Sequence, residues 1–225
     1  MTLPPKHRWL LVGLFAIAMG YLEAAVVFYL RTMINRMDPY QPNPLPNFGS
    51  LGIPEICREA ATMVMLLTVG SIAGLTWRGR LGFILFTFGV WDIAYYVFLV
   101  PLTGWPRTLL DWDILFLIPL PWWGPVLAPV SIALLMVAFG ILSTVLEQAE
   151  PPIWPRRLSA LACAAGIPIA LYVFMADAIA AAPHGTEAVR NVLPQHFNWP
   201  LFLLAWLLLA APVFDVARQL VMRYR

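Results

Sequence analysis

The sequence has few charged residues. Only 12% of its 225 residues are Asp, Glu, Lys or Arg, and 61% are hydrophobic, whereas soluble domains carry about 25% charged residues. A chain this apolar cannot cover a surface that faces water, so its solvent must largely be lipid. The formal net charge of +2 is too small to indicate a nucleic-acid partner. The composition therefore predicts an integral membrane protein.

Cysteine and the common catalytic motifs are also scarce. The two cysteines, Cys57 and Cys163, fall in different apolar segments. A disulfide requires Cα atoms within roughly 7 Å, so we expect none. The sequence contains no His-Glu-x-x-His pair, no Gly-x-Ser-x-Gly turn and no Gly-rich phosphate-binding loop. It therefore identifies neither a nucleophile nor a complete set of metal ligands.

Several apolar runs are long enough to cross a bilayer as helices, which takes about 20 residues each. The first run is longer than the core of a signal peptide, so we interpret it as a retained helix. We predict an all-α, polytopic transmembrane helix bundle of about six spans, which forms a single transmembrane domain over residues 1–225. The spans are expected near residues 9–30, 54–77, 81–100, 125–146, 158–181 and 199–219.

The stretch 111–130 does not have the pattern of a plain span. Its apolar residues are interrupted by Pro119, Pro121, Pro125 and Pro129. Each proline removes a backbone donor, and lipid offers no replacement partner for the freed backbone groups. We therefore expect a short, Pro-broken segment that lies at the membrane interface or re-enters the membrane, followed by a full span.

Basic residues are divided unevenly between the two ends of the expected spans. The group on the side of the termini comprises Lys6, Arg8, Arg78, Arg80, Arg156, Arg157, Arg218, Arg223 and Arg225, and the other comprises Arg31, Arg36, Arg58, Arg107 and Arg190. Lys and Arg concentrate in cytoplasmic loops and tails. We therefore place both termini in the cytoplasm and the protein in a bacterial plasma (inner) membrane.

Most acids that the membrane could bury fall in the outer halves of the spans. An acid at mid-membrane costs at least about 2.5 kcal/mol, so it normally faces protein, water or a counter-charge. Glu23 shares a helix face with Gly20 and Ala16, and Asp92 shares one with Gly89. Such faces pack against other helices rather than lipid, which predicts a polar pocket that opens outward.

The expected pocket has a defined set of candidate residues. The ligand-binding or proton-carrying candidates are Glu23, Arg58, Glu59, Asp92, Tyr95, Tyr96 and Asp113, and the metal-ligand candidates are Glu23, Glu59 and Asp92. Several carboxylates in reach of one another can bind a hard cation or a carboxylate-bridged metal pair. They can also relay protons, because burial raises a carboxyl pKa toward neutrality.

A structural interpretation of the same acids stays open. Glu23 or Glu59 would then pair with Arg31 or Arg58, and Asp92 would bond to Tyr95, Tyr96 or Trp112. For Asp111 and Asp113, which precede an apolar run, a helix N-cap is the stronger interpretation and a place at the rim of the pocket the weaker one.

Four blocks of the sequence resemble an uncharacterised family of prokaryotic multi-pass membrane proteins. They are YLEAAVVFYLR (21–31), REAAT (58–62), WDIAYY (91–96) and WDILFLIPLPWWGPV (112–126). The resemblance covers roughly the first two-thirds of the chain. It implies a membrane location and no known activity.

Two classes of function follow from these observations. In the first, the pocket binds a cation, a divalent metal or a small polar ligand, for transport or for membrane-embedded catalysis. In the alternative, the chain is a non-catalytic accessory or assembly subunit that packs against other membrane subunits of a larger complex. The acids would then be structural. The lipid bilayer is a partner in both.

Overall fold

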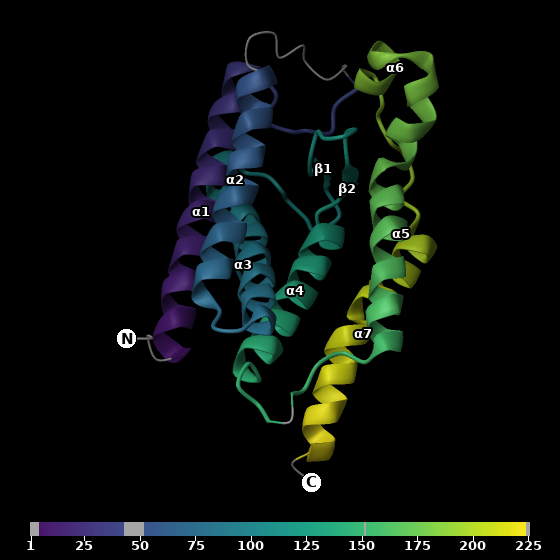
Figure 1. Cartoon of the computed structure of the whole chain (residues 1–225). Coiled ribbons are helices and arrows are strands. Elements are labelled where there is room, and N and C mark those ends of the chain that lie inside the picture. Colours follow the sequence, from purple (N-terminus) through teal and green to yellow (C-terminus); the bar gives the residue numbers. More distant parts are fainter. Residues whose placement is uncertain (1–4, 43–51, 151, 224–225) are drawn as a thin grey trace.

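Six long helices make up most of the protein (Figure 1). The computed structural model describes residues 5–42, 52–150 and 152–223. Its long helices are α1 (Pro5–Met33), α2 (Gly52–Ala73), α3 (Trp77–Thr103), α4 (Leu127–Val145), α5 (Arg157–Ala181) and α7 (Trp199–Arg223). Each is long and apolar enough to cross a membrane. The prediction of an all-α membrane bundle of about six spans is confirmed.

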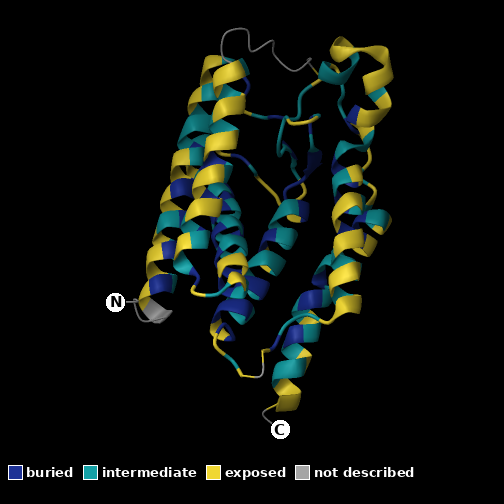
Figure 2. Ribbon diagram, viewed as in Figure 1, coloured by how far each residue is buried: buried dark blue, intermediate teal, exposed yellow. Residues whose placement is uncertain are grey.

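The surface of the bundle explains why it needs lipid. Large apolar side chains on the outer helix faces are freely accessible, including Leu14 (54% exposed), Ile72 (78%) and Leu158 (80%). Figure 2 shows exposed residues along the outer sides of the long helices and buried residues facing inward. Continuous apolar faces of this kind would be unfavourable in water and are typical of transmembrane helices.

Helix α3 lies at the centre of the first half of the fold, where it packs against α1, α2 and α4. Its ends follow from local sequence. The Thr76 side chain accepts a hydrogen bond from the Gly79 N–H at the N-terminus, and Gly104 ends the helix in a left-handed conformation with φ 71°. The interface with α4 is close at Gly140, where a Cβ would come within 2.6 Å of the Gly82 carbonyl oxygen.

The second half is built on the pair α5 and α7, and α7 also packs against α4. A 3-10 turn, η2 (Ala182–His184), and the short helix α6 (Thr186–Arg190) follow α5. Figure 1 shows this pair beside the α1–α4 group, with both chain ends at one end of the molecule and α6 at the other.

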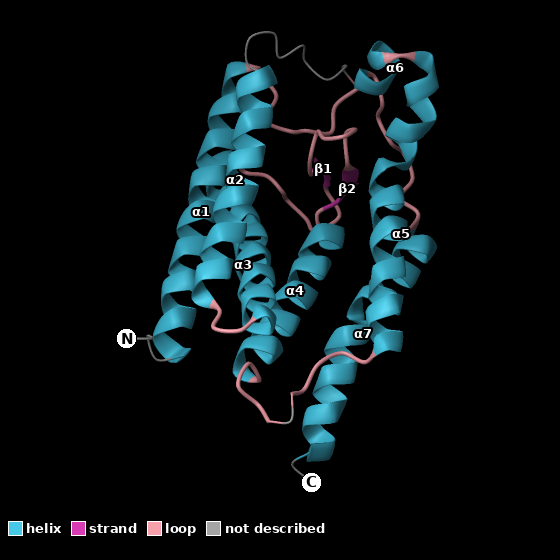
Figure 3. Ribbon diagram, viewed as in Figure 1, coloured by secondary structure: helices cyan, strands magenta, loops and turns pink. Residues whose placement is uncertain are grey.

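The Pro-broken segment between α3 and α4 is a small β-hairpin (Figure 3). Strands β1 (Trp112–Ile114) and β2 (Trp123–Pro125) are antiparallel, and Asp113 lies opposite Gly124. The backbone N–H of Leu115 donates to the Trp122 carbonyl (2.8 Å), which extends the pairing beyond the strands. Pairing with itself gives this segment the backbone partners that a proline-interrupted helix would lose.

The segment that follows α1 contacts both the hairpin and the loop that precedes α7. The Tyr40 hydroxyl donates to the Pro194 carbonyl (2.6 Å), and its ring stacks on Trp112 with the ring centroids 5.8 Å apart. Trp112 in turn contacts Phe197 edge-to-face. The hairpin is therefore held between the α1–α3 group and the loop that precedes α7.

Candidate functional site

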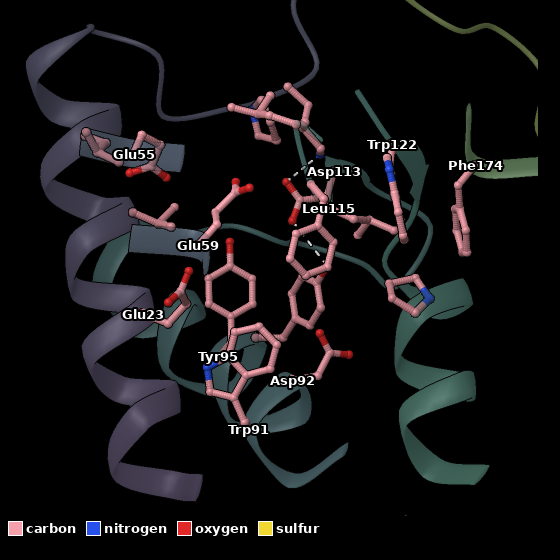
Figure 4. Close-up of a pocket in the computed structure, with 18 of the residues that line it drawn as sticks. Glu23, Glu55, Glu59, Trp91, Asp92, Tyr95, Asp113, Leu115, Trp122 and Phe174 are labelled. Carbon is pink, nitrogen blue, oxygen red and sulfur yellow. Dashed lines mark hydrogen bonds between the residues drawn. The ribbon is translucent and has the colours of Figure 1, made fainter. Parts of the chain in front are cut away.

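A pocket of about 250 Å³ lies between α1, α2 and α3 on one side and the hairpin, α4 and α5 on the other (Figure 4). All seven candidate residues from the sequence line it: Glu23, Arg58, Glu59, Asp92, Tyr95, Tyr96 and Asp113. The structure also adds Arg31, Trp91, Trp122 and Phe174 to the wall. Arg31 was expected only as a partner of Glu23 or Glu59, and in the structure it pairs with Asp113 instead. The three aromatic residues carried no sequence signal that separates them from the other aromatic residues of an apolar chain.

The pocket lies well inside the bundle, on the side away from the termini. Along its helix axis, Glu23 is about 15 Å from the end of α1 at Met33. Asp92 is about 16 Å from the end of α3 at Thr103. Glu59 is about 10 Å from the start of α2 at Gly52. These depths agree with the expected clustering of acids in one half of the spans.

Arg58 on α2 is shared between two of the acids. Its guanidinium forms ion pairs with Glu23 of α1 and with Glu55, one helical turn earlier on α2. The Thr62 hydroxyl also donates to Glu23 (3.4 Å). The structural interpretation of Glu23 as a partner of Arg58 is therefore part of the observed site, and this cluster joins α1 to α2.

Asp113 forms the second charged cluster. Its Oδ1 accepts from Arg31 Nη2 (3.0 Å) and its Oδ2 from the Tyr96 hydroxyl (3.2 Å), while the side chain is 1% exposed. The Arg31 guanidinium carbon also lies 4.4 Å from the centroid of the Trp105 ring, a cation–π contact. Burial raises the pKa of the Asp113 carboxyl, and the charge of Arg31 opposes that rise.

The N-cap interpretation of Asp111 and Asp113 is wrong, because no helix begins there. Asp113 is the middle residue of β1. Asp111 accepts from the backbone N–H of Arg107 (2.7 Å) and from the Thr108 hydroxyl (2.9 Å), so it caps a turn before the hairpin. The prolines that follow exclude the helix that either aspartate would have capped.

Glu59 and Asp92 differ from the other acids that line the pocket because neither forms an ion pair within the described part of the chain. One Glu59 oxygen, Oε2, is buried with no hydrogen-bond partner, and the backbone of Leu117 in the hairpin faces this carboxylate. Asp92 makes no hydrogen bond to any residue that the structure describes, so the expected bonds to Tyr95, Tyr96 or Trp112 do not form. Both carboxylates line the pocket.

The walls around these two carboxylates are aromatic. Tyr95 lies between Glu59 and Asp92 in Figure 4, with Trp91 beneath it. Trp91 is 5% exposed, and its indole Nε1–H has no hydrogen-bond partner among the residues that the structure describes. The indole Nε1–H of Trp122, across the pocket, is also unpartnered. The pocket therefore combines unpaired acceptors with unpaired donors, which are groups that a bound polar molecule would satisfy.

The three metal-ligand candidates do not gather into one cluster. Among residues 5–42, 52–150 and 152–223, no three His, Cys, Asp or Glu side chains are close enough to hold a metal ion together. Glu23 is bound to Arg58, and Figure 4 places Glu59 and Asp92 on two sides of Tyr95. The arrangement suits a ligand that occupies the space between them.

The chain matches no known family model, no curated protein and no solved structure. The chemistry of the site is therefore derived from its own geometry.

Proposed function

We propose that this multi-span membrane protein binds a small organic cation in the pocket between α1, α2, α3 and the hairpin. The observation that carries the proposal is that Glu59 and Asp92 line one cavity and that neither forms an ion pair with any residue that the structure describes. A buried carboxylate is unfavourable unless a positive charge or hydrogen bonds compensate it. A cationic ligand would supply that compensation at both positions.

An organic ammonium suits the cavity better than a bare metal ion. Trp91, Tyr95 and Tyr96 line the wall near the carboxylates, and aromatic faces attract ammonium groups by cation–π interaction. The separation of the carboxylates does not favour a compact metal centre. The free indole N–H of Trp91 further favours a ligand with an acceptor, such as a hydroxyl, beside its positive charge.

The other half of the bundle supports binding on one side rather than a continuous transport path. Leu66 and Phe83, both 1% exposed, fill the helix interfaces on the side of the termini. At that end, Arg8 and Glu147 form a buried ion pair at 3.0 Å. Capture of the ligand, or chemistry on it, from the side of the hairpin is the function most consistent with this distribution.

Choline is a suitable probe, because it combines an ammonium with a hydroxyl. We expect choline to raise the unfolding temperature of the purified protein, and its uncharged isostere dimethylbutanol to have no effect. Glu59→Gln and Asp92→Asn should each weaken choline binding by about tenfold, equivalent to about 1.4 kcal/mol. Glu187→Gln removes an exposed carboxylate of α6 and serves as the control. Equal stabilisation by the isostere, or full choline binding in both pocket variants, would refute the proposal.

We also propose a bacterial plasma membrane with both termini in the cytoplasm. The larger group of basic residues, which includes Arg78, Arg80, Arg156 and Arg157, supports this orientation, and the resemblance to a prokaryotic family supports the location. An alkaline phosphatase fusion after Arg225 should be inactive and a green fluorescent protein fusion fluorescent. The opposite pair of results would reverse the orientation.

A further inference from the structure

The lining of the pocket changes character from one side to the other. The α1, α2 and α3 side carries the tyrosines and all the acids described above except Asp113, which lies on the hairpin and is paired with Arg31 of α1. The remaining residues of the opposite side are apolar and include Leu115, Phe116, Trp122, Ile132, Met136 and Phe174. Figure 4 shows Trp122 and Phe174 across the cavity from Glu23 and Glu59. A ligand that fills both sides needs a charged part and an apolar part.

Two of the helices that line the pocket, α2 and α5, belong to different halves of the fold. Helix α2 packs against α3 and, less extensively, α1, whereas α5 packs mainly against α7. Extensive packing between α2 and α5 is absent from the described helices, although Glu59 of α2 and Phe174 of α5 line the same cavity. The outer faces of both helices are apolar and exposed beside the pocket, as at Ile56 (45% exposed) and Tyr172 (52%). A passage between the two helices would therefore lead sideways toward lipid rather than toward water.

Resting on the proposed function, we infer that the natural ligand is an amphiphile: a lipid with a cationic head group that enters from the bilayer between α2 and α5. Its ammonium lies near Glu59 and Asp92, and the first part of its chain lies against Ile132, Met136 and Phe174. The charged side of the pocket selects the head group, because an uncharged amphiphile leaves both carboxylates without compensation.

The test uses the full chain in lipid nanodiscs with two photoactivatable probes. One is a long-chain alkyl trimethylammonium that carries a diazirine near the head group, and the other is the alcohol with the same chain and diazirine. After irradiation, mass spectrometry locates the labelled residues. The ammonium should label the Ile132–Met136 and Phe174 segments about tenfold more than the alcohol does, which corresponds to a preference of about 1.4 kcal/mol. Labelling of the outer faces of α1 and α7 should be equal for the two probes.

Two variants distinguish the binding of a whole amphiphile from the binding of its head group alone. Glu59→Gln should lower pocket labelling by the ammonium probe and choline binding alike, whereas Met136→Gln, at the apolar side, should lower pocket labelling by a larger factor than it lowers the binding of soluble choline. Choline binding together with equal labelling of all faces by both probes would overturn the amphiphile and leave the proposed function intact. Absence of both choline binding and selective labelling would overturn both.

Discussion

Replacing Asp113 by alanine is expected to lower the free energy of unfolding by about 3–5 kcal/mol, as does removal of one partner from other buried ion pairs. The substitution leaves the Arg31 guanidinium buried with its charge uncompensated, because its side chain is only 9% exposed. The Tyr96 hydroxyl loses its acceptor in the same step. Helix α1, helix α3 and the hairpin meet at this carboxylate, so the loss should affect all three.

Reversible unfolding in mixed micelles measures this effect. Asp111→Ala is the matched control, since Asp111 lies two residues earlier and serves only the turn at Arg107 and Thr108. It should cost about 1 kcal/mol. The double variant Arg31→Met, Asp113→Leu should be more stable than Asp113→Ala, because it removes both charges. A cost below that of Asp111→Ala would show that the Arg31–Asp113 pair does not hold the hairpin in place.

Replacing Glu147 by alanine should have an effect of similar size at the opposite end of the bundle, about 3–5 kcal/mol. Glu147 is 4% exposed and accepts from Arg8 of α1 (3.0 Å) and from the backbone N–H groups of Leu75 and Thr76 (2.8 Å for Thr76). A Cβ at Gly79 would overlap its carboxylate, so the glycine is what lets Glu147 approach the α2–α3 turn. One side chain thus links the start of α1, the α2–α3 turn and the end of α4.

Glu150→Ala is the matched control for this prediction. Glu150 follows Glu147 by less than a helical turn and is exposed, so its removal should change the free energy of unfolding by no more than about 0.5 kcal/mol. The two variants can be compared by unfolding in the same micelles. Equal stability of the two would contradict the anchoring role of Glu147.

The sequence predicted the bundle and the composition of the pocket for one physical reason. Buried charges in lipid must face protein, so helix periodicity could place Glu23 and Asp92 on packed faces. That reasoning rested on local spacing along each helix, which a single sequence contains. The pairing of Glu23 with Arg58 was only one of the alternatives that the sequence left open, and the structure shows that it forms.

The remaining features of the fold and of the site could not be predicted, because they depend on how separate segments of the chain pack together. In the sequence Glu147 is one charged residue in a polar turn, and only folding brings its hydrogen-bond donors, Arg8 and the Thr76 backbone, close to it. Asp113 was interpreted as an N-cap because the pairing of Trp112–Ile114 with Trp123–Pro125 is set by tertiary contacts. In the sequence Trp122 and Phe174 resemble any other apolar residues, and only the packing of the hairpin against α5 brings them together on one wall.

The most direct test of the account is equilibrium binding of radiolabelled choline to the purified protein, with wild type compared with the double variant Glu59→Gln, Asp92→Asn. We predict saturable binding of about one choline per chain, because the pocket is large enough for one small organic cation. The double variant should retain its fold and lose this binding. Absence of saturable binding in the wild type, or binding that the double variant retains, would contradict the claim that these two carboxylates form a cation site.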